Sequence, residues 1–181
     1  MIKRNFISGG LGLLLTVSLL GSCQFSTEKS SSDVEETQNI TTAVEEITFA
    51  DPSEQKVYRA YIVLKNALVE TNYETSKSAA DSLSKTLAEG GMEAESKLAA
   101  HIATDTSIEG QRKQFTDLNT SLIARFKAAS LSTGKIFVQR CPMANNGDGG
   151  EWLASESNIR NPYYGDEMME CGSVIEEITV K

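Results

Sequence analysis

Two cysteines near the C-terminal end of the chain each have methionine close by. Met143 follows Cys141 by two residues, and Met168 and Met169 precede Cys171. Thiolate and thioether sulfurs are the soft ligands that select Cu(I) and similar ions over harder metals. The same two cysteines can equally close a structural disulfide, so the residue types alone predict either a soft-metal site or a covalent cross-link.

The spacing within each motif allows its sulfurs to converge. Residues two apart on a strand share one face, so Cys141 and Met143 can point the same way. Residues three apart suit one helical turn, which brings Met168 towards Cys171, and Met169 is two residues from it. If the two segments meet, they could offer two to four sulfur ligands to Cu(I) or Ag(I). Zinc is less favoured, because no C-x-x-C pattern is present.

A Cys141–Cys171 disulfide is the competing interpretation, with the methionines filling gaps in the core. Closing a loop of 30 residues would stabilise the fold by about 3 to 4 kcal/mol. The two uses do not exclude one another, because reduction of such a bond would release the metal ligands.

Two further residues have both a functional and a structural interpretation, and two more have only a structural one. His101 is the only histidine, and it could add a metal ligand or a proton switch, or simply occupy the face of an amphipathic helix. Trp152 could shield a bound cation through its ring, or anchor the core. Pro162 and Tyr163 are expected to pack in the same C-terminal region.

The sequence predicts no enzymatic activity. It has no glycine-rich phosphate loop and no zinc-protease helix motif. No nucleophile elbow is visible either. Pro142 follows Cys141, where a thioredoxin-like site would continue to a second cysteine.

The N-terminus has the pattern of an export signal. Lys3 and Arg4 precede an apolar stretch from Phe6 to Leu20, which is too short for a comfortable membrane span. The sequence Leu20-Gly21-Ser22-Cys23 resembles a bacterial lipobox, which implies removal of residues 1–22 and a diacylglycerol on Cys23. Gln24 favours the periplasmic face of the outer membrane. The alternative is an ordinary secretory signal with a chance cysteine.

Loss of the signal leaves a shorter and more acidic chain. The 181 residues carry a net charge of −8, and the two basic residues of the signal account for a further change to −10. Such a charge repels nucleic acid, and no basic stripe with aromatic residues is present. Residues 23–51 are rich in Ser, Thr and Glu and are predicted to form a flexible tether. Residues 52–181 are long enough for one domain with a core.

Apolar residues recur at helical spacing between residues 52 and 131. Asp51 can cap the first helix, Pro52 suits its first position, and Gly90-Gly91 can end the second. A third and a fourth helix are expected at about 92–103 and 108–131. The fold class is therefore mainly α, an antiparallel bundle of about four helices.

Residues 132–181 follow a different pattern, with glycine-rich loops and two short β-type runs. Lys135 to Arg140 and Ser173 to Val180 are predicted strands. We expect them to form a small β-hairpin and loop cap that carries the cysteine motifs at one end of the bundle.

Several of these motifs resemble those of domain-of-unknown-function family 3347. The C-terminal motifs are Cys141-Pro142-Met143-Ala144, Trp152-Leu153, Asn161-Pro162-Tyr163-Tyr164-Gly165 and Cys171-Gly172. Tyr58, Ala67-Leu68, Arg112 and Phe115 fit its helical part. The resemblance covers about residues 53–181. It implies an exported bacterial lipoprotein and, because related domains are fused to copper and silver efflux adaptors, heavy-metal handling with efflux components as partners. The family has no established activity.

Two functional hypotheses follow. The first is a periplasmic lipoprotein that binds Cu(I) or Ag(I) through Cys141, Met143 and Cys171, with Met168 or Met169 completing the shell, as an accessory to heavy-metal resistance or efflux. The second is an interaction or scaffold lipoprotein without a metal, in which a disulfide between the two cysteines only holds the cap.

Overall fold

The computed structural model describes residues 46–181. The predicted signal peptide, the predicted lipid attachment site Cys23 and most of the predicted tether lie outside these residues. In the described part of the chain, no helix is both long enough and apolar enough to span a membrane.

Four helices form the first part of the fold, as the sequence predicts. They are α1 (Pro52–Val69), α2 (Tyr73–Glu89), α3 (Glu93–Thr104) and α4 (Ile108–Ala128). Three of them begin at a side-chain cap: Asp51, Asn72 and Ser107 each accept a hydrogen bond from a backbone N–H of the first turn. These caps fix where the helices start and therefore which faces turn inward.

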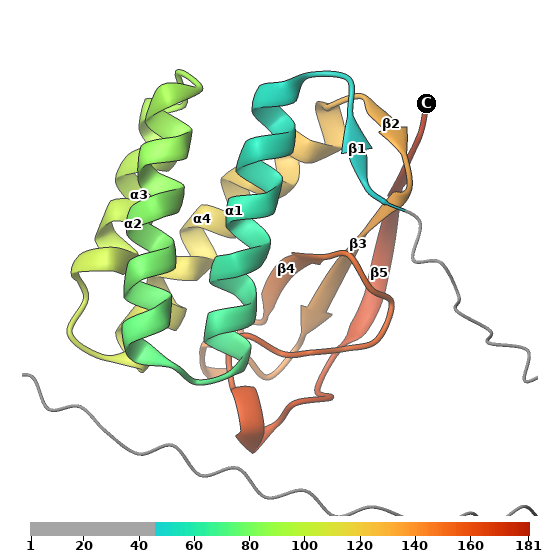
Figure 1. Cartoon of the computed structure of the whole chain (residues 1–181). Helices are drawn as coiled ribbons and strands as arrows, with labels where there is room; N and C mark the ends of the chain where they lie inside the picture. Colours follow the sequence, from blue (N-terminus) through green and yellow to red (C-terminus); the bar gives the residue numbers. More distant parts are fainter. Residues whose placement is uncertain (1–45) are drawn as a thin grey trace, which may run out of the picture. The chain divides into compact units, whose positions relative to one another are not determined.

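The helices pack in sequence order around one core (Figure 1). α2 lies against α1 and α3, and α3 lies against α4. The apolar residues at helical spacing on α1 are fully buried, namely Val57, Tyr61, Leu64 and Leu68. The ring of Tyr61 stacks on that of Phe115 from α4, with centroids 5.7 Å apart.

A three-stranded antiparallel sheet follows the helices. β3 (Lys135–Cys141) lies between β4 (Gly150–Ala154) and β5 (Ser173–Thr179). The predicted strands correspond to β3 and β5, but the predicted hairpin cap is too small, because it omits β4. Three consecutive side chains of β4, from Trp152 to Ala154, are buried, so the strand has none of the alternation that reveals a half-exposed strand.

A second, two-stranded sheet begins the described fold. β1 (Thr48–Phe49) pairs with β2 (Leu131–Thr133). Phe49 is buried against the rings of Tyr58 and Phe126, at centroid distances of 5.6 and 5.3 Å. The folded region therefore begins at β1. The predicted tether of residues 23–51 includes this strand. The Ser-, Thr- and Glu-rich composition of the predicted tether does not reveal that Phe49 is a core residue.

The two faces of β3 have different neighbours. α4 lies over the face that carries Arg140, and Lys127 of α4 reaches across to Glu176 of β5 with an N–O distance of 2.6 Å. The segment 155–172 covers the opposite face. There the buried amide of Gln139 donates to the carbonyls of Glu156 and Asn158. Cys141, two residues further along the strand, lies on this second face.

Candidate functional site

The two cysteine sulfurs meet at one end of the three-stranded sheet. The Sγ atoms of Cys141 and Cys171 are 2.7 Å apart, although the residues are 30 positions apart in sequence. Cys141 is fully buried at the end of β3, and Cys171 is half-buried just before β5. This juxtaposition is what both a soft-metal site and a disulfide require.

The pairing of β3 with β5 brings the cysteines together. Arg140 lies opposite Ser173 at the end of the register, so Cys171 arrives beside Cys141. Gly172 makes this approach possible. Its φ is +145°, and a Cβ atom there would lie only 2.8 Å from the carbonyl oxygen of Arg140 and 3.1 Å from Cη2 of Trp152. Only glycine fits this position without a shift of the backbone.

Asn161 holds the loop that carries Cys171. Its side-chain amide donates to the carbonyl of Cys171 at 3.1 Å, and its backbone N–H donates to the carbonyl of Met169 at 2.9 Å. Its Oδ1 accepts the backbone N–H of Tyr163 at 2.8 Å. The sequence alone does not predict this role of Asn161. The available signal was the Asn-Pro dipeptide, which favours turn initiation.

The neighbouring thiol raises the pKa of Cys171. The hydrogen bond with Cys141 is the largest cause, followed by burial and the charge on Cys141, while the backbone N–H of Met143 acts in the opposite direction. A raised pKa keeps this thiol protonated at neutral pH. Since the thiolate is both the nucleophile and the metal ligand, metal binding here must release a proton.

Two of the three methionines, Met143 and Met168, contact Cys171 through their backbones. The N–H of Met143 faces Cys171, and its carbonyl accepts the hydroxyl of Tyr164 at 2.7 Å. The carbonyl of Met168 accepts the N–H of Cys171 at 3.1 Å. The side chain of Met143 is 54% exposed, whereas Met168 and Met169 are half-buried. These are the residues that could complete a soft-metal shell.

His101 lies apart from the cysteine pair. It is exposed near the C-terminal end of α3, a helix that packs against α2 and α4. In residues 46–181, no three side chains of His, Cys, Asp or Glu gather closely enough to hold a metal ion. The structure therefore does not bring the predicted histidine ligand to the two cysteines.

The residues predicted to pack in the cap are all buried. Trp152 and Tyr163 meet edge to face, with centroids 6.1 Å apart. The hydroxyl of Tyr163 donates to the carbonyl of Glu151 at 3.0 Å and accepts from the amide of Asn119 on α4 at 3.2 Å. Burial raises the pKa of Tyr163. Through these two hydrogen bonds Tyr163 links β4 to α4.

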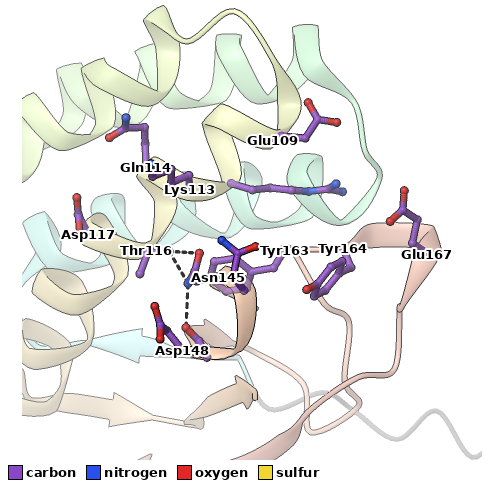
Figure 2. Close-up of a pocket in the computed structure, with 13 residues that line it drawn as sticks. Glu109, Lys113, Gln114, Thr116, Asp117, Asn145, Asp148, Tyr163, Tyr164 and Glu167 are labelled. Carbon is purple, nitrogen blue, oxygen red and sulfur yellow. Dashed lines mark hydrogen bonds between the residues drawn. The ribbon is translucent and has the colours of Figure 1, made fainter. Parts of the chain in front are cut away.

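A polar cavity lies beside the site, between α4 and the loops that flank β4 (Figure 2). Its volume is about 770 Å³. Thr116 and the amide of Asn145 lie within hydrogen-bond distance of each other across it, and Tyr164 links it to Met143. The sequence does not predict this cavity, because its lining comes from three separate segments that share no motif.

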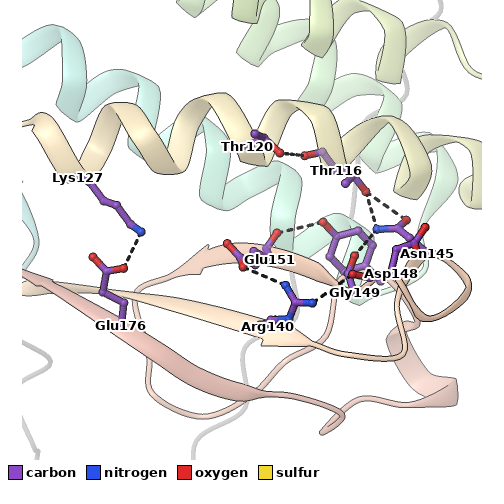
Figure 3. A network of polar contacts seen from close by, with 10 residues as sticks. Thr116, Thr120, Lys127, Arg140, Asn145, Asp148, Gly149, Glu151 and Glu176 are labelled. Carbon is purple, nitrogen blue, oxygen red and sulfur yellow. Dashed lines mark hydrogen bonds and ion pairs between the residues drawn. The ribbon is translucent and has the colours of Figure 1, made fainter.

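A polar network fixes the strand that carries Cys141 (Figure 3). Arg140 donates to the carboxylate of Glu151 and to the carbonyl of Asp148, each at 3.2 Å. These bonds join β3 to β4 and to the loop between them. The buried sulfur is consequently the fixed member of the pair, and Cys171 belongs to the more accessible segment.

Comparison with known proteins supports the predicted resemblance. The profile of the family described as "Protein of unknown function (DUF3347)" matches residues 57–134. This part of the chain is therefore similar to DUF3347. The match runs from α1 to the segment after β2, so it ends before the cysteine motifs. No curated protein and no solved structure matches the chain.

Arg112 connects the DUF3347 helices to the cap. This largely buried residue of α4 donates through Nε to the carbonyl of Pro162 at 3.0 Å. Its Nη2 donates to the carbonyl of Leu68 and to the hydroxyl of Thr71, at 3.1 and 2.9 Å. The loop that positions Cys171 is therefore tied directly to α1 and α4.

Proposed function

We propose that this chain is a cell-envelope lipoprotein that binds one Cu(I) or Ag(I) ion through reduced Cys141 and Cys171, as an accessory to heavy-metal resistance or efflux. The observation that supports it is the 2.7 Å contact between sulfurs of two distant segments. Two soft donors, in segments that also carry Met143, Met168 and Met169, suit a d¹⁰ ion of low charge better than a hard cation.

Metal entry requires the pair to open. Two thiolates that share an ion with metal–sulfur bonds near 2.3 Å lie about 4 Å apart, which exceeds the distance between these sulfurs. Cys171 supplies the movement, because it is half-buried in a loop while Cys141 is fixed in β3. Met143, Met168 or Met169 then completes the coordination.

The proposed anchor is a lipid on Cys23, at the periplasmic face of the outer membrane. The tether would let the domain reach a membrane-bound efflux component. Fractionation of cells that express a Cys23→Ser variant tests this part separately. Its release from the membrane fraction supports the anchor, and its retention contradicts it.

A titration of the reduced protein with Cu(I), in competition with a chromogenic Cu(I) chelator, tests the metal site. We expect one ion per chain and a loss of at least about 100-fold in affinity in a Cys141→Ser/Cys171→Ser variant. Met143→Leu should weaken binding by a smaller factor. Binding by the native chain that is no tighter than that of the double variant contradicts the proposal.

A second candidate function is a scaffold lipoprotein whose cap is held by a Cys141–Cys171 disulfide. The short Sγ–Sγ distance and the burial of Cys141 favour it. Under this proposal the sulfurs bind each other in the resting protein, and the helices provide the functional surface.

The oxidation state of the isolated protein separates the two candidates. A scaffold disulfide predicts a mass about 2 Da below that of the reduced chain. It also predicts a loss of about 3 to 4 kcal/mol of unfolding free energy on reduction. An unchanged melting curve after reduction contradicts the scaffold, whereas tight Cu(I) binding by the reduced form supports the metal site.

A further inference from the structure

The outer face of α1 and α2 carries an apolar centre. The two helices lie side by side at the front of the fold in Figure 1. Between them is a hollow of about 260 Å³. It is lined by Ala60 and Val63 of α1 and by Thr75, Ser78, Ala79 and Ser82 of α2. Val63 is 56% exposed, more than any other large hydrophobic side chain in residues 46–181.

The apolar surface continues on the other side of Val63. A second hollow of about 380 Å³ lies there, and its lining includes Ile47, Tyr58 and Ile62. Val63 therefore forms a ridge between two apolar depressions. A ridge beside a hollow of small side chains can pack against a copy of itself, because each ridge can enter the hollow of the other copy.

Charges of opposite sign lie at the two ends of this face. Lys56 and Arg59 are exposed near the start of α1, and Glu70 and Glu74 are exposed where α1 ends and α2 begins. Lys56 and Glu70 are each seven residues, or about two helical turns, from Val63, so all three share one side of the helix.

Three of these four charges are unpaired within the described part of the chain. Arg59 contacts Glu46 at 3.0 Å. The ion pairs of residues 46–181 do not include Lys56, Glu70 or Glu74. The face thus offers a basic end, an apolar centre and an acidic end, with most of its charge available to a partner.

We propose that this face binds a second copy of the chain, with the two α1 helices antiparallel about a twofold axis beside Val63. The rotation places Lys56 of each copy opposite Glu70 of the other, and it brings the two Val63 side chains together. A twofold contact uses the same patch twice, so each charge pair forms twice.

The charge pattern selects a second copy over an unrelated partner. A twofold operation exchanges the two ends of α1, and these ends carry opposite charges centred on the exposed apolar residue. The proposal is independent of the metal site, since neither Cys141 nor Cys171 lines this face.

Sedimentation velocity of the full chain over a range of concentrations tests the proposal. We expect a concentration-dependent dimer that weakens as salt is raised. Lys56→Glu alone or Glu70→Lys alone should weaken the dimer about tenfold, because each replaces two attractive pairs by two repulsive ones. The combined Lys56→Glu/Glu70→Lys variant should restore the native affinity, since it exchanges the two charges.

Lys97→Glu is the matched control, because it makes the same charge change at an exposed position of α3. It should leave the dimer unchanged, and Val63→Glu should abolish it. A chain that stays monomeric up to about 1 mM overturns the proposal. Failure of the combined variant to recover, or equal weakening by Lys97→Glu, overturns it as well.

Discussion

At the residue scale, Gly172 controls whether the two sulfurs can meet. It lies beside Cys171, and its backbone has a conformation that other residues adopt with strain. Its missing side chain leaves room for the carbonyl of Arg140 and for the ring of Trp152. The cysteines provide the chemistry of the site, but this glycine provides their approach.

Gly172→Ala should therefore destabilise the fold by about 2 to 4 kcal/mol, from backbone strain together with a steric clash. Gly147→Ala is the control for strain alone: its φ is +98°, but no atom lies within 4 Å of an added Cβ. We expect that control to cost about 1 kcal/mol. Urea denaturation measures both changes. Equal losses of unfolding free energy in the two variants would show that a Cβ at position 172 causes no steric clash beyond the backbone strain.

The pKa of Cys171 also depends on contacts with single residues. Its pKa is raised chiefly by the hydrogen bond with Cys141. The folded reduced protein therefore keeps a proton that the unfolded chain loses above its ordinary thiol pKa of 9.0. The stability linked to this proton is complete below pH 9 and declines as the pH rises through the higher folded value.

Alkylation of the reduced protein with iodoacetamide across pH 7 to 11 tests whether the pKa of Cys171 is higher in the folded than in the unfolded chain. We expect the midpoint for Cys171 to lie above that of an unfolded control peptide, and to move down in Cys141→Ala. A midpoint that is unaffected by loss of Cys141 would contradict the assigned cause.

At the scale of elements, local patterns predicted the four α-helices of residues 46–181 and two strands of the larger sheet. Caps and helical spacing specify α1 to α4, and runs of β-type residues specify β3 and β5. β4 was missed because its consecutive buried residues show no alternation, and β1 because it has only two residues. The convergence of the cysteine motifs was predicted only as a hypothesis, since it depends on strand register, which local sequence does not determine.

Lys65 is another feature that local patterns could not reveal. It occurs on α1 between predicted core positions, yet its side chain is fully buried, and its Nζ lies 2.6 Å from the carboxylate of Glu156. The partner is 91 residues away. Burial opposes the charged form of Glu156, but the hydrogen bond and charge of Lys65, together with the Ser155 hydroxyl and the charge of Arg160, lower the pKa of the carboxyl.

Glu156→Gln should cost about 2 to 3 kcal/mol of unfolding free energy, because it leaves the Lys65 ammonium buried without a counter-charge. Lys65→Met/Glu156→Gln should recover part of this loss. The native pair should weaken in acid: its contribution is present above pH 4.5, the ordinary pKa of glutamate, and is lost as the pH falls through the lower folded pKa. A double variant no more stable than the single one would rule out an unpaired charge as the cause.

At the scale of the whole molecule, the DUF3347 helices and the cysteine-bearing cap share one core. Buried residues from α1 to β5 form a single hydrophobic cluster that includes Cys141. The family match ends at residue 134, but the hydrophobic core continues to β5. Arg112 joins the two regions, because its guanidinium donates to the cap loop through Nε and to the end of α1 through Nη2.

Arg112→Lys should therefore loosen the cap more than the helices. Lysine keeps the charge but cannot donate in two directions from one rigid group. Hydrogen exchange should show faster amide exchange at 161–172, with α2 and α3 unchanged. Arg125→Lys is the control, since Arg125 pairs with Glu54 at 2.7 Å within the helical region. If Arg112→Lys also separates the sulfurs, Cys171 should react faster with iodoacetamide than in the control. Uniform loss of protection across the fold would instead show that cap and helices open only as one unit, and that the site cannot be exposed without unfolding.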